Sequence, residues 1–244
     1  MAFVDNSHLF PMSFAMYEEF ISQNTVVTGT PEAIMIQQVG ERLAHAAYQW
    51  LSSLGYGHFL DEYRWAFTLI EDDAVNAWVM PGGKIVFYTG ILPVTKNEAG
   101  IAVVMGHEIA HALLNHGQQR MSAGILQEIG ALGLMVGMQA AGVSESAQMG
   151  WMAAYGIGTT IGATLPFSRR HENEADYYGL ILMTLAGYDP AEAAAFWERM
   201  NALGSGASMP QFLSTHPSSA NRTRQLRNWI PEAERRAAEI RANF

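Results

Sequence analysis

The sequence contains no cysteine, so neither a disulfide nor a catalytic thiol can contribute to this protein. Charged residues are also scarce, at 15% of the 244 residues, and acidic side chains outnumber basic ones by 23 to 14. The resulting formal charge of −9 argues against a nucleic-acid-binding surface, which requires clustered positive charge. No internal repeat is visible, and 49% of the residues are apolar. Residues 1–244 are therefore expected to form a single enzyme-sized domain with a sizeable core.

One short motif indicates metal chemistry. His107, Glu108 and His111 form the pattern His-Glu-x-x-His. Helical residues at positions i and i+4 lie one above the other, so both imidazoles can reach one metal ion. The glutamate can then act as general base toward a water molecule at that metal. Because so short a pattern also occurs by chance, the surrounding sequence must decide between a metal site and an ordinary helix.

The surrounding sequence predicts a buried helix. Thr95 and Glu98 fit a capping box with Thr95 as the N-cap, and Gly117 supplies a stop. Between these signals the residues are small and aliphatic on nearly every side of the helix, which is typical of a buried element. Two histidines and a carboxylate in such a helix need partners, and a metal ion with its water would satisfy all three.

Zinc needs a third protein ligand, and the segment 168–179 offers one. Glu172 and Asp176 again stand four residues apart on an expected helix. Glu172 can bind the zinc, while Asp176 accepts a hydrogen bond from the other ring nitrogen of a ligand histidine. A solvated, charged helix face is the alternative, and it suits Arg169 and Glu174 better than it suits this pair.

Together these motifs resemble the HtpX-type, CAAX-prenyl-protease-type and Oma-type zinc metallopeptidases, the minigluzincins, whose periplasmic relatives include BepA and LoiP. The matching segments occur in that family's order: Asn76-Ala77-Trp78, Pro81-Gly82-Gly83-Lys84-Ile85, His107-Glu108-Ile109-Ala110-His111, Glu172-Asn173-Glu174-Ala175-Asp176, and Thr215-His216-Pro217 with Arg222. The resemblance implies that Glu172, not Glu174, is the third zinc ligand.

The expected fold class is α+β: a mainly helical, zincin-like metallopeptidase domain with a small antiparallel sheet beside the His-Glu-x-x-His helix. Alternation and aromatic content predict strands, and Pro81-Gly82-Gly83 is a strong turn signal between two of them. The strands are expected over 63–70, 76–80 and 84–88. Further helices are expected over 13–20, 30–54, 189–204 and 217–229, and from 231 onward.

An exposed edge strand next to the zinc helix could bind an extended peptide through main-chain hydrogen bonds. The family resemblance favours such an edge near residues 76–79, although an ordinary hairpin is the alternative. The candidate substrate-binding residues are Asn76, Ala77, Trp78 and Val79.

His216 stands at a junction just before a predicted helix. The resemblance favours a functional role over that of a turn histidine, in one of two forms. Its imidazole could stabilise the oxyanion of the tetrahedral intermediate, or it could occupy the open site of zinc in a resting state. His116 and His171 are expected to be polar surface or helix-end residues.

The segment 121–167 is crowded with Gly, Ala and Met, and residues 146–167 carry no charge. Some members of the resembled family have membrane spans in this position. However, Glu128, Gln139 and Glu145 interrupt the segment, whereas a span needs about 20 predominantly apolar residues. We therefore expect a soluble helical hairpin insertion near the active site, where its adaptable methionine side chains could form a lid.

These features predict a zinc-dependent endopeptidase that hydrolyses peptide bonds of proteins, with Zn²⁺ held by His107, His111 and Glu172. Glu108 would be the general base, and the partner would be a polypeptide in extended conformation, not a nucleic acid. Two alternatives remain open. One is a chaperone-like domain that binds unfolded envelope proteins while its zinc site stays capped, and the other is a membrane-associated CAAX-type peptidase.

The start of the chain suggests where in the cell the protein is located. Residues 1–11 lack the long apolar core of a signal peptide. The polar segment 6–14 resembles the lead-in of family members that are exported as lipoproteins. We therefore expect a removed signal and lipid anchor, a periplasmic or envelope-associated location, and a role in cell-envelope protein quality control.

Overall fold

The computed structural model describes residues 6–119, 138–139, 143–144, 168–205, 209–217 and 220–244. The helices are α1 (Asn6–Gln23), α2 (Pro31–Ser53), α3 (Leu92–Thr95), α4 (Glu98–Leu113), α7 (Arg169–Leu185), α8 (Ala191–Gly204), α9 (Gln211–Thr215) and α10 (Ala220–Arg241). The strands are β1 (Val26–Val27), β2 (Ala66–Ile70), β3 (Ala77–Met80) and β4 (Lys84–Tyr88), and two short 3₁₀ helices cover Gly57–Leu60 and Thr89–Ile91. The predicted class, mainly helical with one small sheet, is confirmed.

The sheet is mixed, so the prediction of an antiparallel sheet is wrong in one respect. Its strand order is β1-β2-β4-β3, and β2 runs parallel to β4 while the other two pairs are antiparallel. The predicted hairpin of β3 and β4 is present, and Gly82 and Gly83 adopt the positive φ values of its turn. After β2 the chain crosses to the far edge of the sheet and forms β3. The hairpin then places β4 between β2 and β3, where β4 runs in the same direction as β2.

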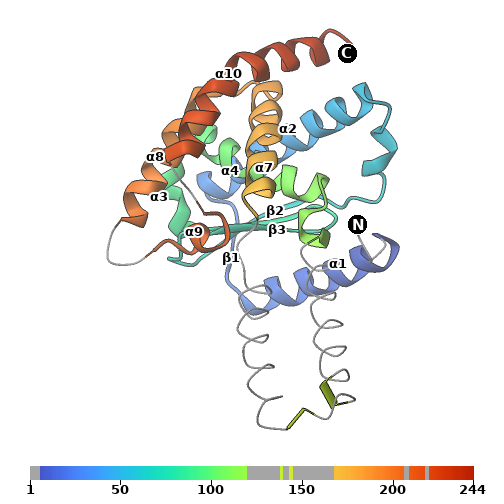
Figure 1. Cartoon of the computed structure of the whole chain (residues 1–244), viewed down its shortest axis with the longest axis vertical. Coiled ribbons are helices and arrows are strands. Elements are labelled where there is room, and N and C mark those ends of the chain that lie inside the picture. The colour runs from blue at the N-terminus through green and yellow to red at the C-terminus, as the bar shows by residue number, and fades with distance from the viewer. Residues whose placement is uncertain (1–5, 120–137, 140–142, 145–167, 206–208, 218–219) are drawn as a thin grey trace.

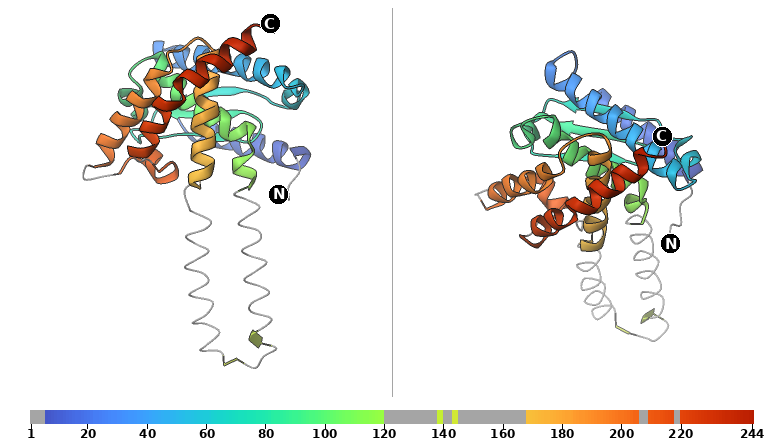
Figure 2. Two further views of the ribbon diagram at one scale, coloured as in Figure 1. Left: turned by 45° about the horizontal axis from the view of Figure 1, so that its top comes forward. Right: turned by 90° about the horizontal axis from the view of Figure 1, so that it is seen from above.

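Helices cover both faces of the sheet (Figure 1). Val86 of β4 packs with Tyr17 of α1 in a small cluster between α1 and the sheet, whereas Ile85 and Phe87 point the other way into the main core. That core lies between the sheet and the helices α2 and α4, and α7 and α10 form the next layer outward (Figure 2). The strand β4 is thus buried on both sides, and α4 lies in the middle of the molecule.

The central helix α4 is buried along its length, as predicted, but its boundaries differ from the prediction. Its N-cap is Asn97, whose side-chain oxygen accepts a hydrogen bond from Gly100 N at 3.0 Å. Thr95 instead ends the short helix α3, so the capping-box assignment is wrong. The helix stops at Leu113, before Gly117, and Asn115 then adopts a left-handed conformation with φ of 55°.

Two other helices extend beyond their predicted limits. The helix α1 covers Asn6–Gln23 instead of 13–20. The two helices expected near the C-terminus form one continuous α10 that contains Pro231. Its side chains Leu226 and Ala233 are buried on either side of this proline, so packing against the core outweighs the lost backbone hydrogen bond. The helix α2 begins as predicted, with Thr30 Oγ1 accepting from Ala33 N.

The helices α4 and α7 cross at very close range through two glycines. A Cβ atom added to Gly106 would lie 2.9 Å from the carbonyl oxygen of Gly179, and one added to Gly179 would lie 2.9 Å from His107 N. The backbones therefore touch where the helices cross, and this contact brings the N-terminal half of α7 over the two histidines of α4.

The predicted hairpin insertion over 121–167 lies outside the described residues, except for 138–139 and 143–144. Its role as a lid, and the assignment of residues 1–244 to a single domain, stay predictions. Among the helices that the structure describes, none is both long and apolar enough to cross a membrane.

The close helix crossing predicts the effect of adding one methyl group. Gly179→Ala should lower the free energy of unfolding by about 1–3 kcal/mol, because the new Cβ would overlap the backbone of α4. Gly117→Ala is the matched control, since its Cβ would meet no atom within 4 Å, and it should be at least as stable as the wild type. Chemical denaturation measures both, and equal stability of the two variants would contradict the close crossing.

Candidate metal centre

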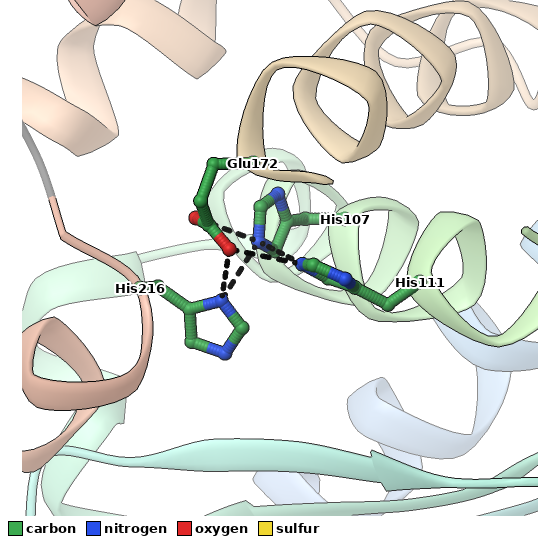
Figure 3. A group of neighbouring side chains, drawn as sticks. All are labelled: His107, His111, Glu172 and His216. Atoms are coloured by element: carbon green, nitrogen blue, oxygen red, sulfur yellow. Dashed lines mark hydrogen bonds and ion pairs between the residues drawn. The ribbon is translucent and has the colours of Figure 1, made fainter. Parts of the chain in front are cut away.

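Four side chains from three elements converge at one point. His107 and His111 project from α4, Glu172 comes from the first turn of α7, and His216 follows α9 (Figure 3). One donor atom from each lies within 4.8 Å of the other three, and all four residues are buried. We call His107, His111, Glu172 and His216 the donor group. The sequence predicted three of them as metal ligands and the fourth as a residue at the open side of the metal.

The distances between the donor atoms fit a single zinc ion. Tetrahedral zinc with ligand bonds of about 2.0–2.1 Å places its ligand atoms about 3.3 Å apart. His107 Nε2 lies 3.0 Å from His111 Nε2 and 3.1 Å from His216 Nδ1. Glu172 Oε1 lies 3.2 Å from His111 Nε2 and 3.0 Å from His216 Nδ1. Nitrogen and carboxylate donors at these spacings suit zinc.

The hydrogen bond from His107 to Asp176 determines which ring nitrogen of His107 faces the other donor atoms. His107 Nδ1 lies 3.0 Å from Asp176 Oδ1. An ionised carboxylate only accepts, so Nδ1 carries the proton and Nε2 turns its lone pair toward the other donors. A lone pair that faces a carboxylate oxygen inside a protein requires a cation or a proton between them, and this requirement supports a bound metal.

Burial and charge keep the donors in the form that binds a cation. Burial lowers the pKa of both His107 and His111, so these imidazoles are neutral. Burial alone would raise the pKa of Glu172, but the Arg222 guanidinium beside it holds that pKa well below its usual range. Arg222 Nη1 lies 2.8 Å from Glu172 Oε2, and Arg222 also donates to both oxygens of Asp176. One guanidinium therefore orients both acidic residues.

Glu108 lies beside the donors without joining them. Its Oε1 is 3.4 Å from His216 Nε2 and has no hydrogen-bond partner among the described residues. Burial raises the pKa of Glu108 to about 7 in the absence of a metal, and a divalent cation nearby would lower it again. A buried carboxylate next to the donor atoms is placed to accept a proton from a water molecule and to release it again.

His216 is held firmly in the centre. Its backbone N donates to Phe212 O at 2.9 Å, and its ring stacks on Phe212 with centroids 4.5 Å apart. Burial would lower the pKa of His216, but the carboxylates of Glu108 and Glu172 outweigh burial and raise it. Its Nδ1 lies among the four donor atoms, while its Nε2 faces Glu108. The imidazole of His216 therefore lies between the candidate metal position and the carboxylate of Glu108.

The predicted substrate edge is the outer strand of the sheet. Among the described residues no strand pairs with the far side of β3. Asn76 O accepts from Tyr88 N in the ladder with β4, so alternation turns the backbone groups of Ala77 and Val79 away from β4, where Val79 is half-buried and Ala77 is fully buried. The ring of Trp78 instead packs edge-on against Phe20 of α1, at a centroid distance of 5.0 Å.

A small cavity lies between this edge strand and the helix α4. It has a volume of about 30 Å³ and is lined by Val79 and Met80 of β3 and by His111 and Ala112 of α4, among others. The edge strand therefore ends beside one of the candidate ligands.

One residue of the site was not foreseen, because His116 was expected at the surface. It is fully buried, and its Nδ1 lies 2.9 Å from Nδ1 of His111. Burial lowers the pKa of His116 to about 4, so its ring is neutral. His171 is half-buried and stacks on His116 with centroids 4.4 Å apart. The left-handed Asn115 returns the chain onto His111, and helical spacing gives no signal for such a turn.

Comparisons with known proteins agree with the fold and the site, which together define a zincin-like metallopeptidase domain. The model of peptidase family M48 matches residues 33–230. The chain belongs to this family, and metallopeptidases of the family use zinc.

Three relatives illustrate the similarity. The mitochondrial metalloendopeptidase OMA1 of Schizosaccharomyces pombe is 39% identical over 176 residues, which cover 72% of this chain and 49% of that protein. The human mitochondrial metalloendopeptidase OMA1 is 29% identical over 180 residues, covering 71% and 34% respectively. The beta-barrel assembly-enhancing protease of Escherichia coli is 32% identical over 170 residues, covering 66% and 34%. The chain thus spans about half or less of the length of each of these three.

The expected periplasmic or envelope-associated location is wrong. The relatives from fission yeast, budding yeast, Arabidopsis, zebrafish and human are all named as mitochondrial proteins, although the Escherichia coli relative is not. The expectation was based on the polar segment 6–14, taken as a lipoprotein lead-in. In the structure this segment belongs to α1, where Leu9 and Phe10 are buried in the core. These two apolar side chains therefore serve packing.

We expect the wild-type protein to bind a single Zn²⁺ ion per chain and Glu172→Ala to lose it, because the substitution removes the carboxylate of the donor group. Glu234→Ala is the control, since it removes an exposed carboxylate of α10 that lies outside the group and should keep the zinc. Elemental analysis after equilibration with zinc measures both, and Glu174→Ala beside them. Full zinc content in Glu172→Ala, or zinc loss in Glu174→Ala alone, would contradict the assignment.

Proposed function

We propose that this chain is a zinc-dependent endopeptidase that hydrolyses peptide bonds of proteins and acts in protein quality control. The observation that carries the proposal is the buried donor group with the carboxylate of Glu108 beside it. Membership of peptidase family M48 supports it, as do relatives named as metalloendopeptidases. The Escherichia coli relative, named for enhancing β-barrel assembly, supports a role in quality control.

In this proposal His107, His111 and Glu172 hold the zinc. When bound, zinc would acidify a water molecule and polarise the scissile carbonyl. Asp176 keeps the His107 ring in the tautomer that offers Nε2. Arg222 engages Glu172 Oε2 and so directs Oε1 of the same carboxylate to the centre.

Glu108 would act as the base and then as the acid. Its carboxylate takes a proton from the attacking water and later delivers it to the nitrogen of the leaving amine. Two features support this role: Glu108 is adjacent to the ligand His107 in the sequence, and its Oε1 has no hydrogen-bond partner among the described residues that would compete for the proton.

His216 would be the fourth ligand in the resting enzyme. Its Nδ1 is as close to Glu172 Oε1 and His107 Nε2 as the other ligand atoms are to one another. Substrate would then have to displace the imidazole from the donor group before hydrolysis. The same closed geometry would suit a chaperone-like domain with a capped zinc site. Peptide-bond hydrolysis by Glu108 and His216 variants therefore distinguishes the endopeptidase from the chaperone-like domain.

The substrate would be a polypeptide in extended conformation that pairs with the outer edge of β3. The backbone groups of the half-buried Val79 would supply hydrogen bonds in the manner of an added strand, whereas those of the fully buried Ala77 would first have to become accessible. Main-chain pairing does not depend on the side chains of the substrate. It therefore suits an enzyme that acts on unfolded or misassembled proteins.

Glu108→Gln should retain zinc and lose hydrolysis of an unfolded protein such as casein. Glutamine has nearly the same shape but cannot accept the proton of the water. The control is Glu234→Gln, the same substitution at an exposed position of α10, which should cleave at the wild-type rate. Peptide release and zinc content are measured together. Wild-type cleavage by zinc-loaded Glu108→Gln would exclude the general-base role.

His216→Ala should raise casein hydrolysis, because it removes the imidazole that closes the site. The exposed His58 provides the control substitution, His58→Ala, which should change nothing. Initial rates at equal zinc content measure the effect. If His216 instead stabilised the oxyanion, turnover would fall by about 10²- to 10³-fold, and that result would contradict the resting-ligand role.

A further inference from the structure

A chain of hydrogen bonds leads from the second histidine of the motif to the protein surface. His111 Nδ1 lies 2.9 Å from His116 Nδ1, and His116 Nε2 lies 3.2 Å from Glu174 Oε2. The other oxygen of Glu174 accepts from Arg170 Nε at 2.9 Å. His116 is fully buried, whereas Glu174 is one-third exposed, so the chain connects the metal centre to solvent-facing residues of α7.

The direction of each proton follows from the end of this chain. The ionised carboxylate of Glu174, paired with Arg170, can only accept, so the proton of the neutral His116 ring resides on Nε2. His116 Nδ1 then has a lone pair, and the short contact between the two Nδ1 atoms requires that His111 donates. His111 Nε2 is therefore left with its lone pair, and this atom belongs to the donor group.

We propose that His116 and Glu174 are positioning residues for the metal: they set the tautomer and the ring orientation of His111. This inference rests on the proposed function to the extent that His111 binds zinc. It gives the two motif histidines equivalent support from α7. Asp176 serves His107 directly, and Glu174 serves His111 through His116.

The backbone is shaped for this contact. In an uninterrupted helix, His116 would be five residues after His111 and turned about 140° away from it around the axis. Asn115, with φ of 55°, breaks the helix and reverses that displacement, so the His116 ring returns to the face of His111. The rings lie nearly perpendicular, at 75°, with centroids 4.9 Å apart.

Zinc affinity, measured by competition with a chromophoric chelator, tests the proposal. His116→Leu keeps apolar bulk but removes the acceptor, and it should weaken zinc binding by about 10- to 100-fold. His116→Asn should recover most of this loss, because its side-chain oxygen can take the place of Nδ1. Glu174→Ala should weaken binding in the same direction. The absorption spectrum of the Co²⁺-loaded protein should shift in His116→Leu and return toward wild type in His116→Asn.

The control is His171→Leu, which removes the ring stacked on His116 but leaves the acceptor for His111 in place, and it should bind zinc as wild type does. Circular dichroism verifies folding, and if His116→Leu does not fold, His116→Asn and Glu174→Ala decide the question. Wild-type affinity and cobalt spectra in the His116 and Glu174 variants would overturn the proposal, as would a His116→Asn protein that binds as weakly as His116→Leu. Failure of the wild type itself to bind zinc would instead overturn the proposed function.

Discussion

The helices α4 and α7 touch through their backbones at Gly106 and Gly179, and this contact sets the distance between the histidines on one helix and the acidic residues on the other. Glu172 reaches the donor group from the first turn of α7, Asp176 reaches His107 one turn later, and the contact at Gly179 follows almost one turn after that. A wider crossing would move both carboxylates away from α4 together. The packing of two glycines therefore determines whether the ligands can meet.

Charge balance provides a second constraint on the same site. Among the described residues, three buried carboxylates, those of Glu108, Glu172 and Asp176, face one buried guanidinium, that of Arg222, which leaves an excess of two negative charges in their ionised forms. Buried charge without compensation is strongly unfavourable. A divalent cation removes the excess. Without it, protons can compensate instead: burial raises the pKa of Glu108 to about 7, and the carboxylates of Glu108 and Glu172 raise the pKa of His216.

Much of the site could be predicted because its information is local. The spacing of His107 and His111, and that of Glu172 and Asp176, follows the helical repeat, and both pairs are on helices whose termini carry side-chain caps. What the sequence could not reveal depends on contacts between distant residues or on single backbone angles. The contact of His116 with His111 depends on the left-handed Asn115, which has no sequence signal. Arg222 stands in a family motif, but neither its ion pairs with Glu172 and Asp176 nor the parallel pairing of β2 with β4 has a local signal. Thr95 and Asn97 are both acceptable caps, and the short helix α3 determines that Asn97 is used.

Anomalous diffraction at the zinc edge, from crystals of the zinc-loaded protein, tests the central claim most directly. The structure predicts a zinc peak at about 2.0–2.1 Å from His107 Nε2, His111 Nε2 and Glu172 Oε1, with His216 Nδ1 as the fourth ligand of the resting state. His116 should then lie against the outer nitrogen of His111, as it does in the present structure. A zinc ion at a different position, or one bound through Glu174 in place of Glu172, would contradict this account.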